Sequence, residues 1–391
     1  MPDMPVNMSR RQLIQSGLIG FAGLSLFSPA ILANTPTSSA TATQGLQLAS
    51  SVKTDTAGHQ MLYLTNGTDY SKDAKLLPSG WRGHQVAASP DGRYLVSVAR
   101  RPGTQLLVQD RQLGKQNLID AATERHFYGH GLFSADSQYL YCPENDYENA
   151  LGVIGVYRVD QGFKRIGEWS SHGVGPHQIA WVYAKQATGQ PAAPLLVVAN
   201  GGIETHPDYP RIKLNLDTMQ PNLSYLDLSG QLIQQVTPPH HQLSLRHLDV
   251  APDGQVWVGA QYQGEVHESP NLIYSHKLGE ATLAAVGADD TLWPQLKAYI
   301  ASVACHNQTD TVCITAPRDN QITLWQRSSG KLIKQIDQTD CAGVCAHPTQ
   351  PYYLVSGGDG TLAAYHAGTG HRLWQQTLQG IRWDNHLSWI G

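Results

Sequence analysis

The sequence predicts an all-β fold, a seven-bladed β-propeller in which a C-terminal strand completes the first blade. Three observations predict it. Short segments of β-forming residues recur along the chain, polar turns that contain glycine separate them, and residues 386–390 have the pattern of a strand without neighbours in their own repeat. A pair of β-sandwiches or two barrels is the alternative, and the end-to-end repeat argues against it.

The repeat is clearest in residues 345–375. Four short segments of β-forming residues follow one another there, separated by turns, which is the pattern of one propeller blade. Five further stretches follow the same plan: residues 83–120, 128–169, 175–236, 246–286 and 300–336. The third of these carries an insertion at residues 201–221. Together the stretches predict six blades.

The N-terminal end of the domain predicts the seventh blade. Three segments match the second, third and fourth strands of the repeat: residues 46–53, 60–66 and 74–77. Residues 386–390 can supply the missing first strand, because a blade built from both ends of the chain closes the ring without a weak seam. We therefore expect one propeller domain over residues 46–391, with His386 beside His84 of the next blade.

The N-terminus has the pattern of an export signal. A twin-arginine motif at residues 9–14 precedes a mildly apolar run over residues 18–32. About fifteen residues interrupted by a proline are short for a bilayer span, so we expect cleavage and no stable membrane span in the mature protein. Residues 1–33 are the predicted signal peptide, with cleavage as late as residue 42 as the alternative, and residues 34–45 are a linker. The predicted location is the periplasm.

Composition and charge exclude one class of partner and one cofactor. The formal net charge is −4 and Lys and Arg are scattered, so no basic stripe for nucleic acid is present. The five cysteines include no CxxCH motif, which excludes covalent c-type haem. Cys142 is expected to be a buried free thiol, and the spacing of the other four allows one disulfide in an oxidising compartment.

Histidines recur at the start of the predicted first strands, which line the central channel of a propeller. Aligned on the following turn, three lie near one level and two are offset by about one residue: His84, His177 and His386, and then His130 and His247. Imidazoles that converge on the channel are suited to a divalent metal or to acid–base chemistry. The three at one level are the predicted metal ligands, with iron or another divalent metal as the cofactor. The alternative is that each histidine only links neighbouring blades by hydrogen bonds.

Arg246 beside His247 is a second candidate. An arginine at a channel mouth binds carboxylate or phosphate well, and strand alternation predicts that Arg246 and His247 point to opposite sides. An interblade salt bridge is an equally good interpretation of Arg246. By contrast, His306 and His347 align with the far end of the first strand and are expected to be structural.

The insertion at residues 201–221 is the third candidate. It is rich in oxygen and nitrogen donors, has no helical period and is too polar for a core, so it is a candidate lid or partner surface. A solvated surface loop is the alternative. The insertion, the residue before it and a later polar loop contribute the remaining predicted ligand-binding residues: Asn200, Arg211, Asn215, Asp217 and Gln261.

Seven strings of the sequence carry a family resemblance: residues 175–177, 200–203, 205–208, 214–219, 245–248, 261–264 and 383–386. They resemble a family of twin-arginine-exported bacterial propeller proteins with a domain of unknown function, related to the YVTN and quinoprotein amine dehydrogenase-like propellers. The resemblance covers nearly all of the mature chain. Such proteins are often encoded beside imelysin-like and di-haem peroxidase-like proteins, so it implies a role in periplasmic iron handling with these two kinds of partner.

Three functions are compatible with these observations. The first is a periplasmic module that binds a metal or a protein partner in iron acquisition. The second is an enzyme at the channel mouth, either a metal or siderophore oxidoreductase or a hydrolase with His247 as base and Arg246 as clamp, since residues 175–177 and 246–254 are similar to first strands of lactonase-type propellers. No GxSxG or GxGxxG motif supports an enzyme. The third is an interaction scaffold whose histidines are all buried and satisfied.

Overall fold

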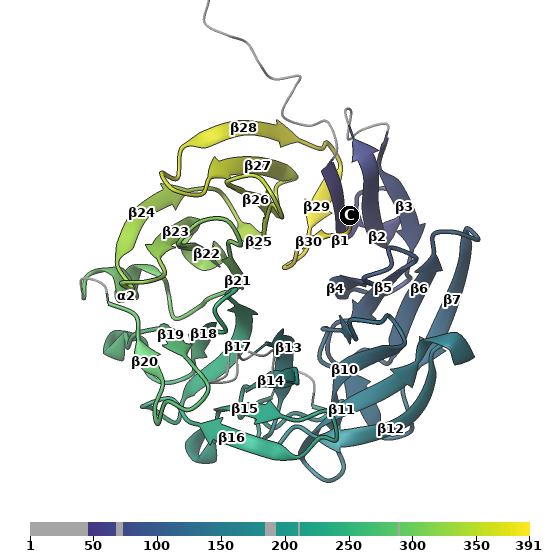
Figure 1. Ribbon diagram of the computed structural model, residues 1–391, viewed down its shortest axis with the longest axis horizontal. Coiled ribbons are helices and arrows are strands. Elements are labelled where there is room, and N and C mark those ends of the chain that lie inside the picture. The colour runs from purple at the N-terminus through teal and green to yellow at the C-terminus, as the bar shows by residue number, and fades with distance from the viewer. Residues whose placement is uncertain (1–45, 68–72, 184–192, 210–211, 288–289) are drawn as a thin grey trace, which may run out of the picture. The chain divides into compact units, whose positions relative to one another are not determined.

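The computed structural model describes residues 46–67, 73–183, 193–209, 212–287 and 290–391. These residues form a ring of seven antiparallel sheets, each a blade whose first strand lies at the centre and whose last strand lies at the rim (Figure 1). The seven-bladed propeller predicted from the repeat is confirmed, and the alternatives of paired sandwiches or barrels are wrong.

The blades follow one another along the chain. Blade 1 contains β1 (Leu46–Thr54), β2 (Gly58–Gly67) and β3 (Lys75–Pro78), with β29 (Ile381–Trp383) and β30 (Ser388–Trp389) at its inner edge. Blade 2 contains β4 (Gly83–Ala88), β5 (Tyr94–Ala99), β6 (Gln105–Asp110) and β7 (Lys115–Asp120). Blade 3 contains β8 (Arg125–Phe127), β9 (Leu132–Phe133), β10 (Tyr139–Asp146), β11 (Leu151–Arg158) and β12 (Lys164–Ser170).

The remaining four blades have one continuous inner strand each. Blade 4 contains β13 (Pro176–Val182), β14 (Leu195–Asn200), β15 (Asn222–Leu226) and β16 (Leu232–Val236), and blade 5 contains β17 (Leu243–Val250), β18 (Val256–Tyr262), β19 (Ile273–His276) and β20 (Ala284–Ala285). Blade 6 contains β21 (Ser302–Cys305), β22 (Thr311–Ala316), β23 (Gln321–Gln326) and β24 (Leu332–Asp337), and blade 7 contains β25 (Cys341–Ala346), β26 (Tyr352–Gly357), β27 (Thr361–His366) and β28 (Arg372–Thr377). One short helix, α2 (Leu292–Gln295), precedes blade 6.

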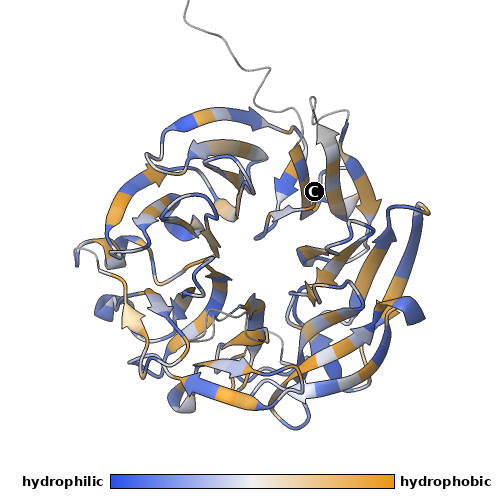
Figure 2. Cartoon of the chain, viewed as in Figure 1, coloured by the Kyte–Doolittle hydropathy of each residue, from blue (hydrophilic) through white to orange (hydrophobic). Residues whose placement is uncertain are grey.

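Burial differs between the strands of a blade because each blade packs face to face between two others. Second strands such as β5 and β22 are buried on both faces, which explains their continuous apolar sequence. Outer strands such as β7 and β24 are exposed on at least one face. Apolar residues therefore recur in every blade around the ring (Figure 2). The largest apolar cluster joins blades 4, 5 and 6 around the buried side chains of Trp257 and Trp325.

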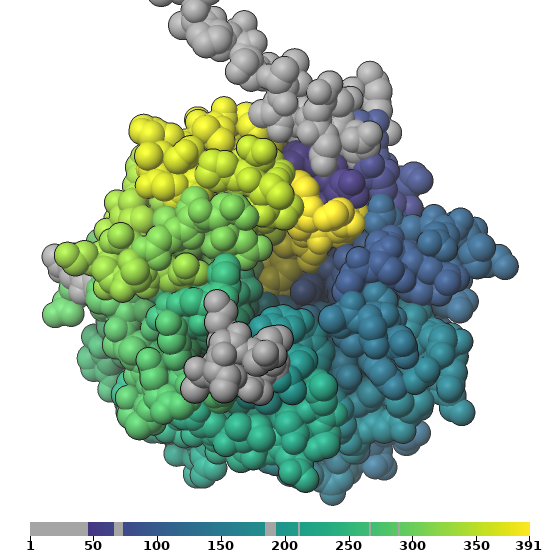
Figure 3. Space-filling model, viewed as in Figure 1, coloured from purple at the N-terminus to yellow at the C-terminus, as the bar shows by residue number. Residues whose placement is uncertain are grey.

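C-terminal residues complete blade 1, as the repeat predicted. Both β29 and β30 pair with β1, and the C-terminal residues (yellow) fill the seam beside the first residues of the ring (purple) in Figure 3. Between the two short strands, the hydroxyl of Ser50 donates a 2.6 Å hydrogen bond to the carbonyl of His386. The inner strand differs from the expected one in its bounds, because it begins at Ile381 and is interrupted between Trp383 and Ser388.

Three further features bear on the predicted export. All five cysteines are buried free thiols, so the disulfide that their spacing allows is not formed. Within the described ranges, no helix has the length and apolar character that a bilayer crossing requires. The predicted signal peptide and linker, residues 1–45, lie outside the described residues, and the twin-arginine signal stays a prediction.

Candidate functional site

Five histidines, one from each of five blades, meet at the centre of the ring. His84 lies in β4, His177 in β13 and His247 in β17. His130 lies in the break between β8 and β9, and His386 lies in the break between β29 and β30. Nine pairs of their ring centroids are 4.5 to 6.0 Å apart. None of the five residues is more than 9% exposed. The histidines that recur at the first strands of the aligned repeats therefore form one buried cluster.

Irregular inner strands bring these histidines together. The pairing register shifts next to His84, His177 and His247, and the inner strand is broken altogether at His130 and His386. A bulge inserts an unpaired residue and re-aims the side chains around it, and bulges are enriched next to functional sites. The one-residue offset of His130 and His247 in the alignment therefore does not keep them out of the cluster.

A glycine makes room for the ring of His84. Gly129 has a φ of +106°, and a Cβ placed on it would lie 2.6 Å from the Cβ of His84. Real carbon atoms do not approach so closely, and a side chain at this φ is strained. The sequence Gly129-His130 thus serves two imidazoles at once, because the glycine accommodates His84 and the next residue supplies its neighbour.

Hydrogen bonds fix the tautomer of His130. The side-chain oxygen of Gln85 accepts the backbone N–H of Gly131 at 3.1 Å and lies 3.1 Å from Nδ1 of His130. Because an amide oxygen only accepts hydrogen bonds, Nδ1 of His130 carries the proton. In the neutral ring, Nε2 then has a free lone pair, and it has no hydrogen-bond partner among the described residues.

His386 links the cluster to two other blades. Its Nε2 lies 3.2 Å from Nε2 of His84, and its Nδ1 lies 2.9 Å from the hydroxyl of Ser302 in β21. The predicted neighbourhood of His386 and His84 is thus observed. The Nδ1 of His84 lies 3.9 Å from Oδ1 of Asp384. This distance is too long for a hydrogen bond, and the negative charge of Asp384 acts to raise the pKa of His84. The carboxylate of Asp384 also accepts two hydrogen bonds from Arg82, at 2.6 Å on Oδ2 and 3.2 Å on Oδ1.

Four buried ring nitrogens of the cluster have no hydrogen-bond partner within the described part of the chain: Nδ1 of His84, His177 and His247, and Nε2 of His130. Buried polar atoms are nearly always hydrogen-bonded in proteins, so four exceptions in one cluster need a reason. A metal ion supplies one, because a neutral imidazole nitrogen is a common metal ligand.

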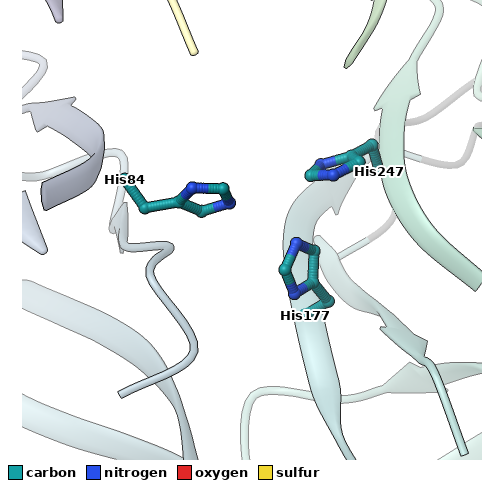
Figure 4. Close-up of side chains that lie close together, drawn as sticks. All are labelled: His84, His177 and His247. Atoms are coloured by element: carbon teal, nitrogen blue, oxygen red, sulfur yellow. The ribbon is translucent and has the colours of Figure 1, made fainter. Parts of the chain in front are cut away.

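Two groups of three imidazoles have ligand nitrogens within 4.8 Å of one another. One is His84, His177 and His247 (Figure 4), and the other is His84, His130 and His386. Imidazole nitrogens bind metals at about 2 Å, so small rotations let three such rings share one ion. The predicted trio of His84, His177 and His386 is neither group. The trio therefore stays a prediction, and the bulge in β17 places His247 beside His177, with ring centroids 4.7 Å apart.

Burial lowers the pKa of all five imidazoles. Neighbouring histidines lower it further in four of them, whose pKa lies well below 6.5: His130, His177, His247 and His386. For His84, burial also lowers the pKa, and the carboxylate of Asp384 opposes the shift. The rings are therefore neutral at neutral pH. Neutral imidazoles are suited to metal ligation, and their low pKa makes them weak general bases.

A cavity of about 610 Å³ opens onto His84, His177 and His247. Six cationic side chains line it, and no described carboxylate does: Arg82, Arg100, Arg101, Lys213, Arg246 and Arg318. Arg82 pairs with Asp384 at 2.6 Å, whereas the other five form no ion pair with a described residue. Burial, followed by the charge of Arg101, lowers the pKa of Arg246 to about 10. The cavity therefore joins three neutral imidazoles to a concentrated positive charge.

Arg246 and His247 line the same cavity, although alternation along a regular strand puts them on opposite sides. The register shift between Leu245 and His247 is the reason, because a bulge ends strict alternation. The interblade salt bridge that offered another interpretation is absent among the described residues, since the Nε of Arg246 donates to the hydroxyl of Ser244 at 2.9 Å. Asp249 instead joins two blades by accepting the backbone N–H of Cys305 at 2.7 Å.

The other predicted ligand-binding residues are not gathered in one place. Gln261 lines the cavity. Asn200 is buried, and its side-chain amide donates hydrogen bonds to the carbonyl of Ser171 at 2.9 Å and to the side chain of Asn222 at 2.8 Å. The side chain of Asn215 accepts the backbone N–H of Glu204 at 2.7 Å and donates to the carbonyl of Gly202 at 2.9 Å. Both residues therefore have structural roles. Asp217 is exposed in a short 3-10 turn, and Arg211 lies outside the described residues. His306 and His347 accept backbone N–H groups in turns, in agreement with a structural role.

Sequence reasoning missed most of the cavity cations. Arg100 and Arg101 follow β5, Lys213 lies in the insertion after β14, and Arg318 follows β22. All of these segments connect the second strand of a blade to its third, and such connections gather at one mouth of a propeller. These cations could have been found from their shared position between the second and third strands of their blades. That position becomes visible only when the corresponding turns of different blades are compared.

Comparisons with known proteins agree with the fold. Hydrazine synthase from Kuenenia stuttgartiensis superposes with a TM-score of 0.57 at 14% identity, over 77% of this chain and 87% of that one. A chain of the mitotic checkpoint complex superposes with a TM-score of 0.54 at 12% identity, over 77% of this chain and 81% of that one. Such identities show a common fold alone.

The comparison with curated proteins found no match. A family model does match, over residues 77–390, which is most of the ring. The family is described as "Protein of unknown function (DUF1513)", and this chain belongs to it.

Proposed function

We propose that this protein binds a divalent transition metal at His84, His177 and His247. One observation carries the proposal: three buried, neutral imidazoles from three blades have ligand nitrogens within 4.8 Å of one another, and each has a buried nitrogen without a hydrogen-bond partner among the described residues. A role that only links blades leaves these nitrogens unexplained, because buried polar atoms are nearly always hydrogen-bonded.

The donor set indicates the class of metal. Three imidazoles suit iron, copper, nickel or zinc, whereas magnesium and calcium prefer oxygen ligands. The three rings line the cavity, so the side of the ion that faces the cavity stays open to a further ligand. Iron is the metal we propose for the cell, in line with the iron handling that the family resemblance implies.

Isothermal titration of the mature, metal-free chain with Fe(II), Co(II), Cu(II) and Zn(II) tests the site. We expect one ion per chain and a loss of affinity of at least about tenfold in His247→Gln, since one of three ligands is removed. His371→Gln is the control, because that side chain is exposed in a turn between β27 and β28. Binding that is absent for every metal, or equal in the two variants, contradicts the proposal.

An enzyme is the second candidate, and one observation favours it: Arg246 and His247 line the same cavity, as a base and an oxyanion clamp require. The low pKa of His247 counts against the hydrolase, because a base with such a pKa is weak at neutral pH. Assays of lactone hydrolysis and of metal or siderophore reduction decide the matter. Activity that is lost in His247→Gln without loss of metal binding supports an enzyme of the lactonase type.

The proposal includes a place of action. The twin-arginine motif at residues 9–14 and the apolar run at residues 18–32 support export to the periplasm. There the imelysin-like and di-haem peroxidase-like proteins implied by the family resemblance are the proposed partners. Cell fractionation tests the location, and co-purification from a periplasmic extract tests the partners. A cytoplasmic chain that is never cleaved contradicts this part of the proposal.

A further inference from the structure

The charge of the cavity above the three histidines is unlike that of the rest of the chain. The whole chain has a formal net charge of −4, yet six cations and no described carboxylate line this one cavity. Like charges that share a partly closed space repel one another, and the repulsion lowers stability. Such an arrangement is explained when an anion binds between the cations.

Five of the cations are free to bind an anion. Arg246 donates to Ser244, Lys213 donates to Gln263 at 2.5 Å, and Arg318 lies 4.3 Å from the ring centroid of Tyr299. These partners are neutral, so they leave the positive charges uncompensated. Elsewhere in the described ring most arginines, though not Arg111 or Arg372, are paired with carboxylates, as Arg165 is with Glu144 at 2.8 Å.

The cations also surround the metal site. They come from the turn after β5, the insertion, the bulge in β17 and the turn after β22, and they share the cavity with His84, His177 and His247. A bare divalent ion that enters this cavity meets repulsion from every side. An ion that arrives with an anionic chelator meets attraction, because the complex carries negative charge at its periphery.

We propose that the cavity binds a small, multiply charged oxyanion, a polycarboxylate or a polyphosphate, whose oxygens complete the coordination of the metal. This inference rests on the proposed metal site, and it adds the chemical class of the second ligand. Arginine suits the role because its planar guanidinium binds carboxylate and phosphate in a bidentate manner. A volume of about 610 Å³ suits a small molecule rather than a peptide or a nucleic acid.

The first test needs no metal. The metal-free mature chain is titrated calorimetrically with citrate and with pyrophosphate at low and high salt. We expect binding of at least one of them, weaker at high salt. The double variant Arg101→Gln, Arg246→Gln should weaken it by at least about tenfold. Arg372→Gln, an exposed arginine in β28 at the rim of the ring, should bind like the wild type.

The two anions identify the source of the ligand. Tighter binding of citrate assigns a polycarboxylate, and tighter binding of pyrophosphate assigns a phosphate compound. If neither anion binds with a Kd below about 1 mM, or if Arg372→Gln loses as much affinity as the double variant, the inference is overturned. Circular dichroism of each variant shows whether it is folded, and the single variant Arg101→Gln replaces the double variant if the latter is not.

The second test adds the metal and separates the two proposals. In the wild type we expect the preferred anion to raise the affinity for Co(II) or Fe(II) at least about tenfold, since the coupling between two ligands is reciprocal. His247→Gln should keep anion binding and lose this coupling. Metal binding without any effect of the anion overturns the inference alone, whereas anion binding without metal binding in any condition overturns the proposed metal site.

Discussion

An imidazole nitrogen that is buried without a partner destabilises a folded protein by about 1–3 kcal/mol. The cluster at the centre of this ring contains four such nitrogens among the described residues, on His84, His130, His177 and His247. Proteins keep such violations of ordinary packing rules mainly at functional sites. Burial also keeps these imidazoles in their neutral form, because it disfavours the charged imidazolium and lowers the pKa.

The lowered pKa values predict how the metal-free protein responds to acid. Below about pH 6.5 the unfolded chain protonates its histidines while the folded cluster does not, so the free energy of unfolding falls as the pH falls. Each histidine contributes up to about 1.4 kcal/mol per pH unit. Urea denaturation at pH 7 and pH 5 should show a smaller loss in the double variant His177→Gln, His247→Gln than in the wild type. A matched control, His371→Gln, should show the wild-type loss, and an unchanged loss in the double variant contradicts the prediction.

Gly129 provides a second prediction about a single residue. Its φ of +106° and the 2.6 Å approach to His84 mean that Gly129→Ala strains the backbone and displaces the imidazole. We expect a loss of about 1–3 kcal/mol in the free energy of unfolding. Gly167→Ala in β12 is the control, because a Cβ there meets no atom within 4 Å. Equal urea midpoints for the two variants would show that His84 moves aside without cost.

At the scale of elements, the inner strands separate what the sequence can predict from what it cannot. The positions of the strands follow from the period of the repeat and from the glycine turns. Their bulges do not, because a bulge depends on how an inner strand packs against the neighbouring blade. Alternation in β17 therefore misplaced Arg246 relative to His247. The general location of the cluster was predictable, since all five histidines lie near the start of a first strand.

The closing strands carry the prediction at this scale. A chain that ends at Asp384 lacks β30 and the hydrogen bond between Ser50 and the His386 carbonyl, and it loses the buried contacts of Leu387. We expect the whole ring to be destabilised, with a lower urea midpoint, because the first blade then presents an unpaired edge. Removal of Gly391 alone is the control, since this residue is exposed. Frayed ends with an unchanged midpoint would mean that the seam is held mainly by β29.

At the scale of the whole molecule, the fold was predictable because the same unit recurs seven times. A repeat supplies many independent observations of one pattern, so an error in one blade does not change the assignment. The cavity was not predictable in the same way. Its cations come from turns of three different blades, from β17 and from the entry to β4, and only closure of the ring brings Arg82, Arg101 and Arg318 to one place.

Metal binding is expected to stabilise the ring as a unit. The three proposed ligands belong to blades 2, 4 and 5, so an ion would add a link between these blades to the packing and hydrogen bonds that already join the ring. At a free metal concentration about one hundred times the Kd, the stabilisation is about 2.7 kcal/mol. Differential scanning calorimetry should show one cooperative transition whose Tm rises with Co(II) in the wild type. In His247→Gln the Tm should stay nearly constant, and a rise of equal size would place the metal elsewhere.

The closure of blade 1 also sets the order of events during synthesis. Ser50 leaves the ribosome 336 residues before His386, which corresponds to roughly 20 to 70 seconds at usual rates of translation. Throughout this interval β1 presents an open edge, and the ring of His84 lacks its neighbour from the C-terminal segment. A nascent or truncated chain therefore has no finished histidine cluster. The five-histidine cluster is complete only after residue 386 has been translated, so the order of the strands makes the imidazole of His386 the last to join it.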